Sequence, residues 1–83
     1  MHNADSIPAL KGRGKAWRRD LLGEYRQRFG RGLLTTVALA TGKDKSVVSR
    51  TYWGHIERPD LRVVEMLSAE LEKLADLRKA SVA

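Results

Sequence analysis

The chain has 83 residues, no cysteine, and a formal net charge of +6 from 16 Lys and Arg against 10 Asp and Glu. This length predicts one domain with a small core, and the lack of cysteine excludes disulfide bonds and thiolate zinc sites as stabilising links. Apolar runs are too short for a transmembrane helix, and the N-terminus lacks the charged-then-apolar order of a signal peptide. We therefore expect a soluble, cytoplasmic protein.

Positive charge is concentrated in the first part of the chain. Residues 1–58 hold 12 Lys and Arg against 5 Asp and Glu, whereas residues 59–83 hold 4 against 5. A basic part beside a nearly neutral one predicts a surface for a polyanion and a separate surface for packing or self-association. The alternative is a basic protein whose charge serves only its solubility.

Residues 1–14 combine Pro8, Gly12 and Gly14 with little apolar material, which predicts a flexible N-terminal arm. The end of this arm is basic, and such an arm either follows the phosphate backbone of DNA or is simply a solvated terminus. The basic residues at and directly after the end of the arm are Lys11, Arg13 and Lys15.

A helix is predicted over residues 15–29, where apolar side chains recur every four residues and form one face directed at the core. The outer face is expected to carry arginines that either contact phosphates or stay in solvent. Gly30 and Gly32 then predict a break. The apolar face is Trp17, Leu21, Tyr25 and Phe29, with Leu22 beside them, and the arginines are Arg18, Arg19, Arg26 and Arg28.

Two short helices are predicted to meet across a tight turn after this break. In the first, Leu33, Val37, Ala38 and Thr41 share one face, and Gly42 supplies the positive φ that ends a helix.

The second short helix is predicted to begin at Lys45. Asp44 before it is expected to cap its free amides through the side chain. Val47, Val48 and either Thr51 or Tyr52 are expected to turn inward.

The spacing of Ala38, Gly42 and Val48 resembles the helix-turn-helix of the lambda repressor and Cro family over about residues 20–75. Pro59 and Asp60 are similar to the residues that open the next helix in that family. Lys43 and Thr51 depart from the family, which has aliphatic core residues at these positions, and Tyr52-Trp53 is bulkier than usual. An ordinary helical hairpin would show similar spacings.

The second helix of such a pair presents its first turns to the major groove of DNA. We therefore predict DNA contacts from the donors on and around residues 45–53 and from the basic arm. The predicted DNA-binding residues are Lys43, Lys45, Ser46, Ser49, Arg50, Thr35, Arg58, Lys11, Arg13 and Lys15.

A last helix is predicted from Leu61 to about Lys79, capped by Asp60. Its leucines recur at spacings of three and four, as in a coiled coil, so residues 60–79 are predicted to join two copies of the chain. The alternative is a long helix that folds back on its own domain. The predicted dimer contacts are Leu67, Leu71, Leu74 and Leu77, followed by a tail at 80–83.

These elements predict an all-α fold: a compact bundle of about five helices with a central helix-turn-helix and a longer C-terminal helix, with the DNA-binding domain at 15–79. His2 and His55 are remote from each other and from carboxylates at ligand spacing, and the carboxylates are expected on a solvated helix face. We therefore expect no enzyme, no metal site and no cofactor.

The expected function is that of a sequence-specific DNA-binding transcriptional regulator. We expect a small repressor from a phage, plasmid or bacterial operon that binds a double-stranded operator as a homodimer, controlled by its concentration, by its dimerisation or by another regulatory protein. The alternative is a helix-turn-helix used as a protein-binding module, such as an antitoxin or a phage-encoded inhibitor of a host protein. RNA binding ranks third, because the aromatic and basic strand motifs of single-strand readers are missing.

Overall fold

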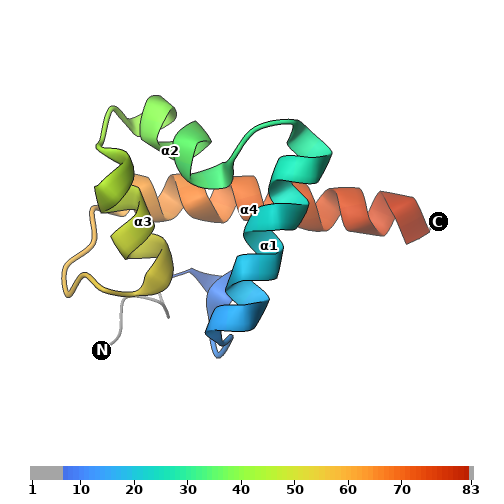
Figure 1. Cartoon of the computed structure of the whole chain (residues 1–83), viewed down its shortest axis with the longest axis horizontal. Helices are drawn as coiled ribbons and strands as arrows, with labels where there is room; N and C mark the ends of the chain where they lie inside the picture. The colour runs from blue at the N-terminus through green and yellow to red at the C-terminus, as the bar shows by residue number, and fades with distance from the viewer. Residues whose placement is uncertain (1–6, 83) are drawn as a thin grey trace.

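The structure, a computed structural model, describes residues 7–82, with side chains through residue 80. A 3-10 turn, η2 (Pro8–Leu10), precedes the α-helices α1 (Lys15–Phe29), α2 (Leu33–Thr41), α3 (Lys45–Trp53) and α4 (Leu61–Val82), and no strand occurs among the described residues (Figure 1). The all-α prediction is confirmed, but the described residues form four α-helices where about five were predicted. Before α1, the described residues form only a single turn, which ends where Lys11 takes an extended backbone conformation.

Glycines end the first three α-helices. Gly42 follows α2 with a φ of 71°, and its amide donates to the carbonyl of Ala38 at 2.9 Å, so the predicted helix end is confirmed. Gly54 ends α3 in the same left-handed conformation. Only a residue without a Cβ adopts this conformation without strain, and it turns the chain sharply toward the next helix.

The two predicted N-caps differ in the structure. The Asp60 carboxylate accepts hydrogen bonds from the amides of Arg62 at 2.8 Å and Val63 at 3.3 Å, as expected for a cap of α4. Asp44 occupies the cap position of α3, but its side chain makes no cap hydrogen bond. The prediction of a side-chain cap at Asp44 is therefore wrong, and only its backbone carbonyl accepts the first helical bonds, from Val47 and Val48.

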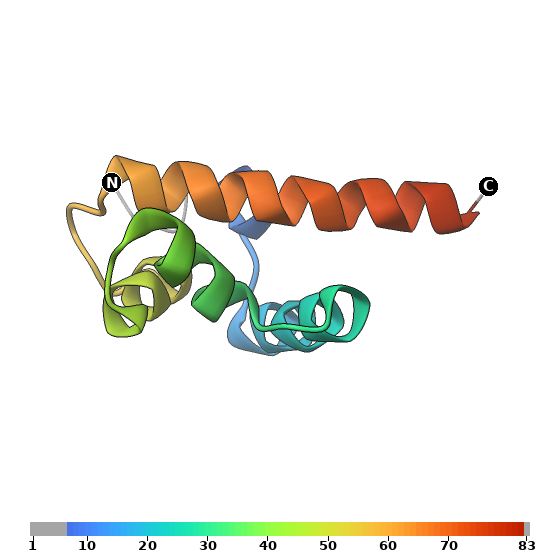
Figure 2. The same cartoon turned by 90° about the horizontal axis from the view of Figure 1, so that it is seen from above.

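Helix α4 is the long element against which the rest of the chain folds. It runs along the longest dimension of a molecule measuring 39 × 27 × 19 Å, and α1, α2 and α3 lie on one side of it (Figure 2). Its inner face buries apolar side chains that recur at helical spacing, which is the arrangement of a helix covering a core. These side chains are Val63, Val64, Leu67, Leu71 and Leu74.

This arrangement contradicts most of the predicted dimer seam. Leu67, Leu71 and Leu74 are 0%, 3% and 1% exposed within the single chain, so they cannot also contact a second copy, and Leu77 is 38% exposed. The alternative, a helix folded back on its own domain, is the one that the structure shows. The helix also continues through Val82, so the predicted tail at 80–83 is wrong for residues 80–82, and residue 83 lies outside the described residues.

The N-terminal segment is part of the core. Ile7 and Leu10 are completely buried, and η2 contacts α4. The prediction of a flexible arm over residues 1–14 is therefore wrong for residues 7–10, because two apolar side chains on a short turn are enough to seal the end of a small core, whereas residues 11–14 are exposed. Residues 1–6 of the predicted arm, including His2, lie outside the described residues.

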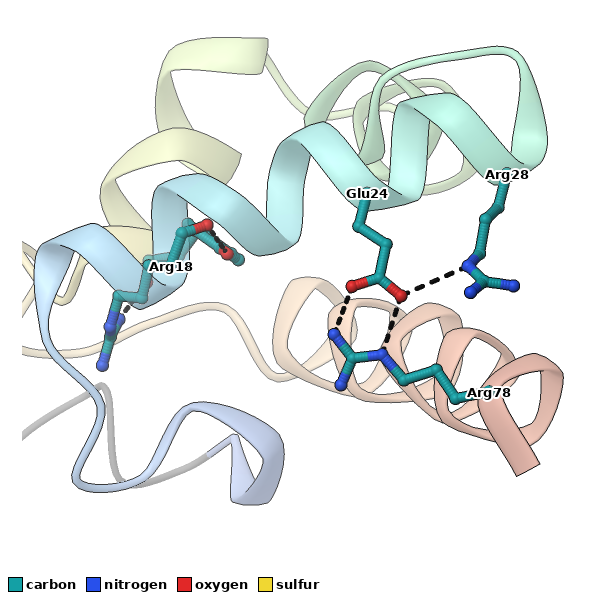
Figure 3. Close-up of polar contacts among 5 residues, drawn as sticks. Arg18, Glu24, Arg28 and Arg78 are labelled. Carbon is teal, nitrogen blue, oxygen red and sulfur yellow. Dashed lines mark hydrogen bonds and ion pairs between the residues drawn. The ribbon is translucent and has the colours of Figure 1, made fainter. Parts of the chain in front are cut away.

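Two polar links join α1 to α4. Tyr25 Oη donates to Glu70 Oε1 at 2.5 Å, and Lys73 Nζ pairs with Glu70 Oε2 at 2.8 Å. Glu24 pairs with Arg78 of α4 and with Arg28 of its own helix (Figure 3). Glu70 was expected on the solvated face but is buried, because Tyr25 gives its carboxylate a partner inside the domain.

Candidate nucleic-acid interface

Helices α2 and α3 contact each other through the faces predicted from the sequence. Leu33, Val37 and Thr41 of α2 are buried, as are Val48, Thr51 and Tyr52 of α3, while Val47 is only partly buried. This pairing leaves one face of α3 in the interior and the other face free of its own chain.

Two threonines occupy core positions in this pair. Thr41 Oγ1 donates to the carbonyl of Val37 at 2.8 Å, and Thr51 Oγ1 donates to the carbonyl of Val47 at 2.9 Å. Each hydroxyl therefore finds its partner one turn back in its own helix, so neither is buried without a hydrogen bond. This explains how Thr51 takes a position expected to be aliphatic.

The outer face of α3 carries four of the ten predicted DNA-binding residues. Lys45, Ser46 and Arg50 are exposed, and Ser49 is partly buried between them. Trp53 lies at the C-terminal end of α3. Its ring packs edge-on against the ring of Tyr52, with 5.2 Å between the ring centroids. The face thus presents two cations and two hydroxyls over about two helical turns.

A depression of about 280 Å³ lies between α1, the start of α2 and the start of α3. Apolar side chains of Leu22 and Leu34 contribute to its lining, together with Thr35, Lys45 and Arg26. The structure therefore places Thr35 next to Lys45, as the predicted set requires. It also brings in Arg26, which the sequence placed on the outer face of α1 without linking it to the helix-turn-helix.

The other predicted residues are distributed around the domain. Lys43 forms an ion pair with Asp60 at 3.3 Å, which ties the turn between α2 and α3 to the start of α4. The carboxylate of Asp60 has a pKa below its ordinary value, because it accepts the amide of Arg62 and the ammonium of Lys43. Arg58 is exposed in the loop after α3.

The basic residues of the N-terminal segment lie near the opposite end of α3 from Lys45. Lys11, Arg13 and Lys15 are exposed, and the guanidinium of Arg13 covers the ring of Trp17 at 4.6 Å from its centre. The guanidinium of Arg18 in α1 donates hydrogen bonds to the carbonyls of both Arg13 and Tyr52, so the N-terminal segment lies close to the C-terminal end of α3. The structure therefore does not bring these three cations together with Lys45.

Arg18 was predicted to lie on the solvated face of α1. In the structure it is only 6% exposed. Figure 3 shows it on α1, in the part of the helix away from Glu24. A sequence signal was present: Arg18 lies three and seven residues before Leu21 and Tyr25, on the same helical stripe. The charge of the side chain concealed this position.

Within residues 7–82, every helix is too short or too polar to cross a membrane, and no group of three or more metal-binding side chains comes together. No protein-family model, no curated protein and no solved structure matches the chain.

Proposed function

We propose that this chain is a sequence-specific DNA-binding regulator that inserts α3 into the major groove and represses transcription by occupying an operator. The observation that carries the proposal is the outer face of α3, where Lys45, Ser46, Ser49 and Arg50 point away from a buried inner face. Lysine and arginine bind guanine O6 and N7, and serine hydroxyls donate to or accept from base edges and phosphates.

The charge distribution supports a polyanionic partner, which we propose the protein meets in the cytoplasm. Lys45 and Arg26 border the depression beside the start of α2, and Arg50 follows on the exposed face of α3. Cations on neighbouring elements release counterions when they approach phosphates, which supplies most of the sequence-independent affinity of such proteins. The resemblance to the lambda repressor and Cro family points in the same direction.

The proposed active form is a homodimer, because one short recognition helix reads too few base pairs to select a site in a genome. Two copies on a twofold axis would place their recognition helices about 34 Å apart on one side of the duplex. Their contact surface has to lie outside Leu67, Leu71 and Leu74, which each chain uses for its own core.

One observation favours the second candidate function, a protein-binding module. Leu39 projects from α2 with 79% of its surface exposed, and Trp53 is only partly buried at the end of α3. Exposed apolar side chains on a helix-turn-helix suit a protein partner, such as the target of an antitoxin or of a phage-encoded inhibitor.

Selection of duplexes from random DNA, followed by gel-shift titration, tests the proposal. Binding to random duplex should weaken with salt as if about four to eight counterions were released per dimer. Arg50→Ala or Lys45→Ala should cost about 1–3 kcal/mol on the selected sequence if the side chain forks onto a guanine, and little on random DNA. Lys79→Ala, an exposed position at the far end of α4, is the charge-matched control.

Two results would count against the proposal. A binding constant that does not change with salt removes the phosphate contacts. Equal losses from Lys45→Ala and Lys79→Ala on the selected duplex show that α3 does not face the DNA. Either result leaves the protein-binding module as the better candidate.

A further inference from the structure

We propose that Arg18 is a positioning residue for the recognition helix: its buried guanidinium fixes the C-terminal end of α3 to α1 and to the N-terminal segment. The part of this inference that concerns DNA reading rests on the function proposed above. The anchoring contact itself is independent of that function, so the two can fail separately.

Arg18 binds three backbone carbonyls, two from the N-terminal segment and one from α3. One terminal nitrogen donates to the carbonyl of Tyr52 in α3, the other donates to Leu10 at 3.1 Å, and Nε donates to Arg13 at 3.2 Å. Among the described residues, no carboxylate forms an ion pair with this side chain. Within residues 7–82, the buried charge is therefore satisfied by backbone oxygens.

Tyr52 returns the contact. Its Oη donates to the carbonyl of Arg18 at 2.6 Å, so each of the two side chains binds the backbone of the other helix. Tyr52 is completely buried, and burial raises the pKa of its phenol while the charge of Arg18 acts in the opposite direction. The phenol thus remains a hydrogen-bond donor at neutral pH, and α1 and α3 are joined by two hydrogen bonds of opposite direction.

The carbonyl of Tyr52 lies in the last turn of α3, where it needs a hydrogen-bond donor from outside the helix. The last carbonyls of a helix lack partners in the helix and carry its negative dipole end, so a cation placed there is favourable. The turn that follows uses the carbonyls of Arg50 and Thr51, which accept from Gly54 and His55. Arg18 supplies the partner that Tyr52 would otherwise lack.

A guanidinium suits this position better than other cations. Its donors are spread over three nitrogens in a rigid plane, so they reach carbonyls that come from separate segments. A lysine ammonium offers its donors from a single atom and reaches fewer of these carbonyls at once. Lysine at position 18 therefore keeps the charge and removes the three-way link.

The consequence for DNA reading follows from the length of α3. Nine residues span only about 13 Å, so a tilt of about 10° at the anchored end moves the other end by about 2 Å. Contacts to base edges need positions held within about 0.5 Å, whereas phosphate contacts tolerate more movement. Loss of the anchor should therefore weaken sequence reading more than overall DNA affinity.

The test compares full-length Arg18→Lys with the wild type and with Arg19→Lys, a conservative change at the exposed neighbouring position. Amide hydrogen exchange of Gly54 and His55 reports the end of α3, and that of Gly42 reports the end of α2 as an internal reference. We expect exchange about tenfold faster at Gly54 and His55 in Arg18→Lys, with Gly42 unchanged. Affinity for a selected duplex should fall about tenfold, and affinity for random duplex should fall much less.

Exchange that stays at wild-type rates at the end of α3 overturns the anchor. Exchange that rises equally at Gly42 and Gly54 shows a general loss of stability and also overturns it. Equal weakening on both duplexes refutes the reading role while the anchor stands. A wild type that binds no DNA refutes the proposed function, and the exchange comparison still decides the anchor.

A milder variant covers the case in which Arg18→Lys does not fold. Tyr52→Phe removes only the phenolic donor and keeps the carbonyl that Arg18 binds. It should raise exchange at Gly54 and His55 in the same direction by a smaller factor. Unchanged exchange at Gly54 and His55 in a folded Tyr52→Phe overturns the proposed link, because the two hydrogen bonds between Arg18 and Tyr52 are proposed to hold the same end of α3.

Discussion

Replacing Leu74 with alanine distinguishes a helix that covers its own core from one that joins two copies. Leu74 is 1% exposed within the single chain, so the change removes buried methyl groups and leaves a cavity, at a cost of about 2–5 kcal/mol. A chain of 83 residues has a total stability of about 4–12 kcal/mol. The loss is therefore a large part of the total stability, and the melting temperature should fall by about 10–30 °C.

The assay is thermal unfolding followed by circular dichroism at a low and a high protein concentration. Leu39→Ala is the matched control, because Leu39 is 79% exposed and its truncation should change the stability by less than about 0.5 kcal/mol. If Leu74 contacts only its own chain, the destabilisation is the same at both concentrations. The reasoning is refuted if the melting temperature of the wild type rises with protein concentration and Leu74→Ala abolishes that rise. In that case the leucine seam would again be a dimer contact.

Three further changes test the local geometry and the buried carboxylate. Gly42→Ala should destabilise the domain by about 1–2 kcal/mol, since the new Cβ meets no atom within 4 Å and the cost comes only from the φ of 71°. Gly23 lies inside α1, and a Cβ added there also meets no atom within 4 Å, so Gly23→Ala should stabilise the domain by about 0.5–1 kcal/mol. Urea unfolding measures both variants, and shifts in the same direction would contradict these two predictions. Burial raises the pKa of Glu70, but hydrogen bonds from Lys73 and Tyr25 outweigh it and hold the pKa below 4.5. Its ionised form therefore stabilises the fold above that pH, and Glu70→Gln should be less stable at neutral pH by about 1 kcal/mol, with the difference shrinking as the pH falls below about 4.5. A constant difference in urea unfolding across this range would show that the charge of Glu70 contributes nothing.

The helices of this protein could be predicted from local signals. The four-residue spacing of apolar side chains predicted α1 with its observed bounds, Lys15 and Phe29, and Gly42 predicted the end of α2. The inward positions of α3 followed from the same rule, which leaves Lys45 and Arg50 on the exposed face. These predictions succeeded because a helix period and a glycine at positive φ are properties of a few consecutive residues.

The sequence by itself therefore determined the all-α class, the turn between α2 and α3, and the polar face of the candidate recognition helix. Only the tertiary structure decided which charged and apolar side chains become buried. Arg18 and Glu70 are buried because carbonyls and a phenol from distant segments satisfy them, and Leu10 and Leu74 are buried because η2 and α4 close the same core. Burial of this kind depends on which segments meet in space, and a local pattern of residues does not contain that information.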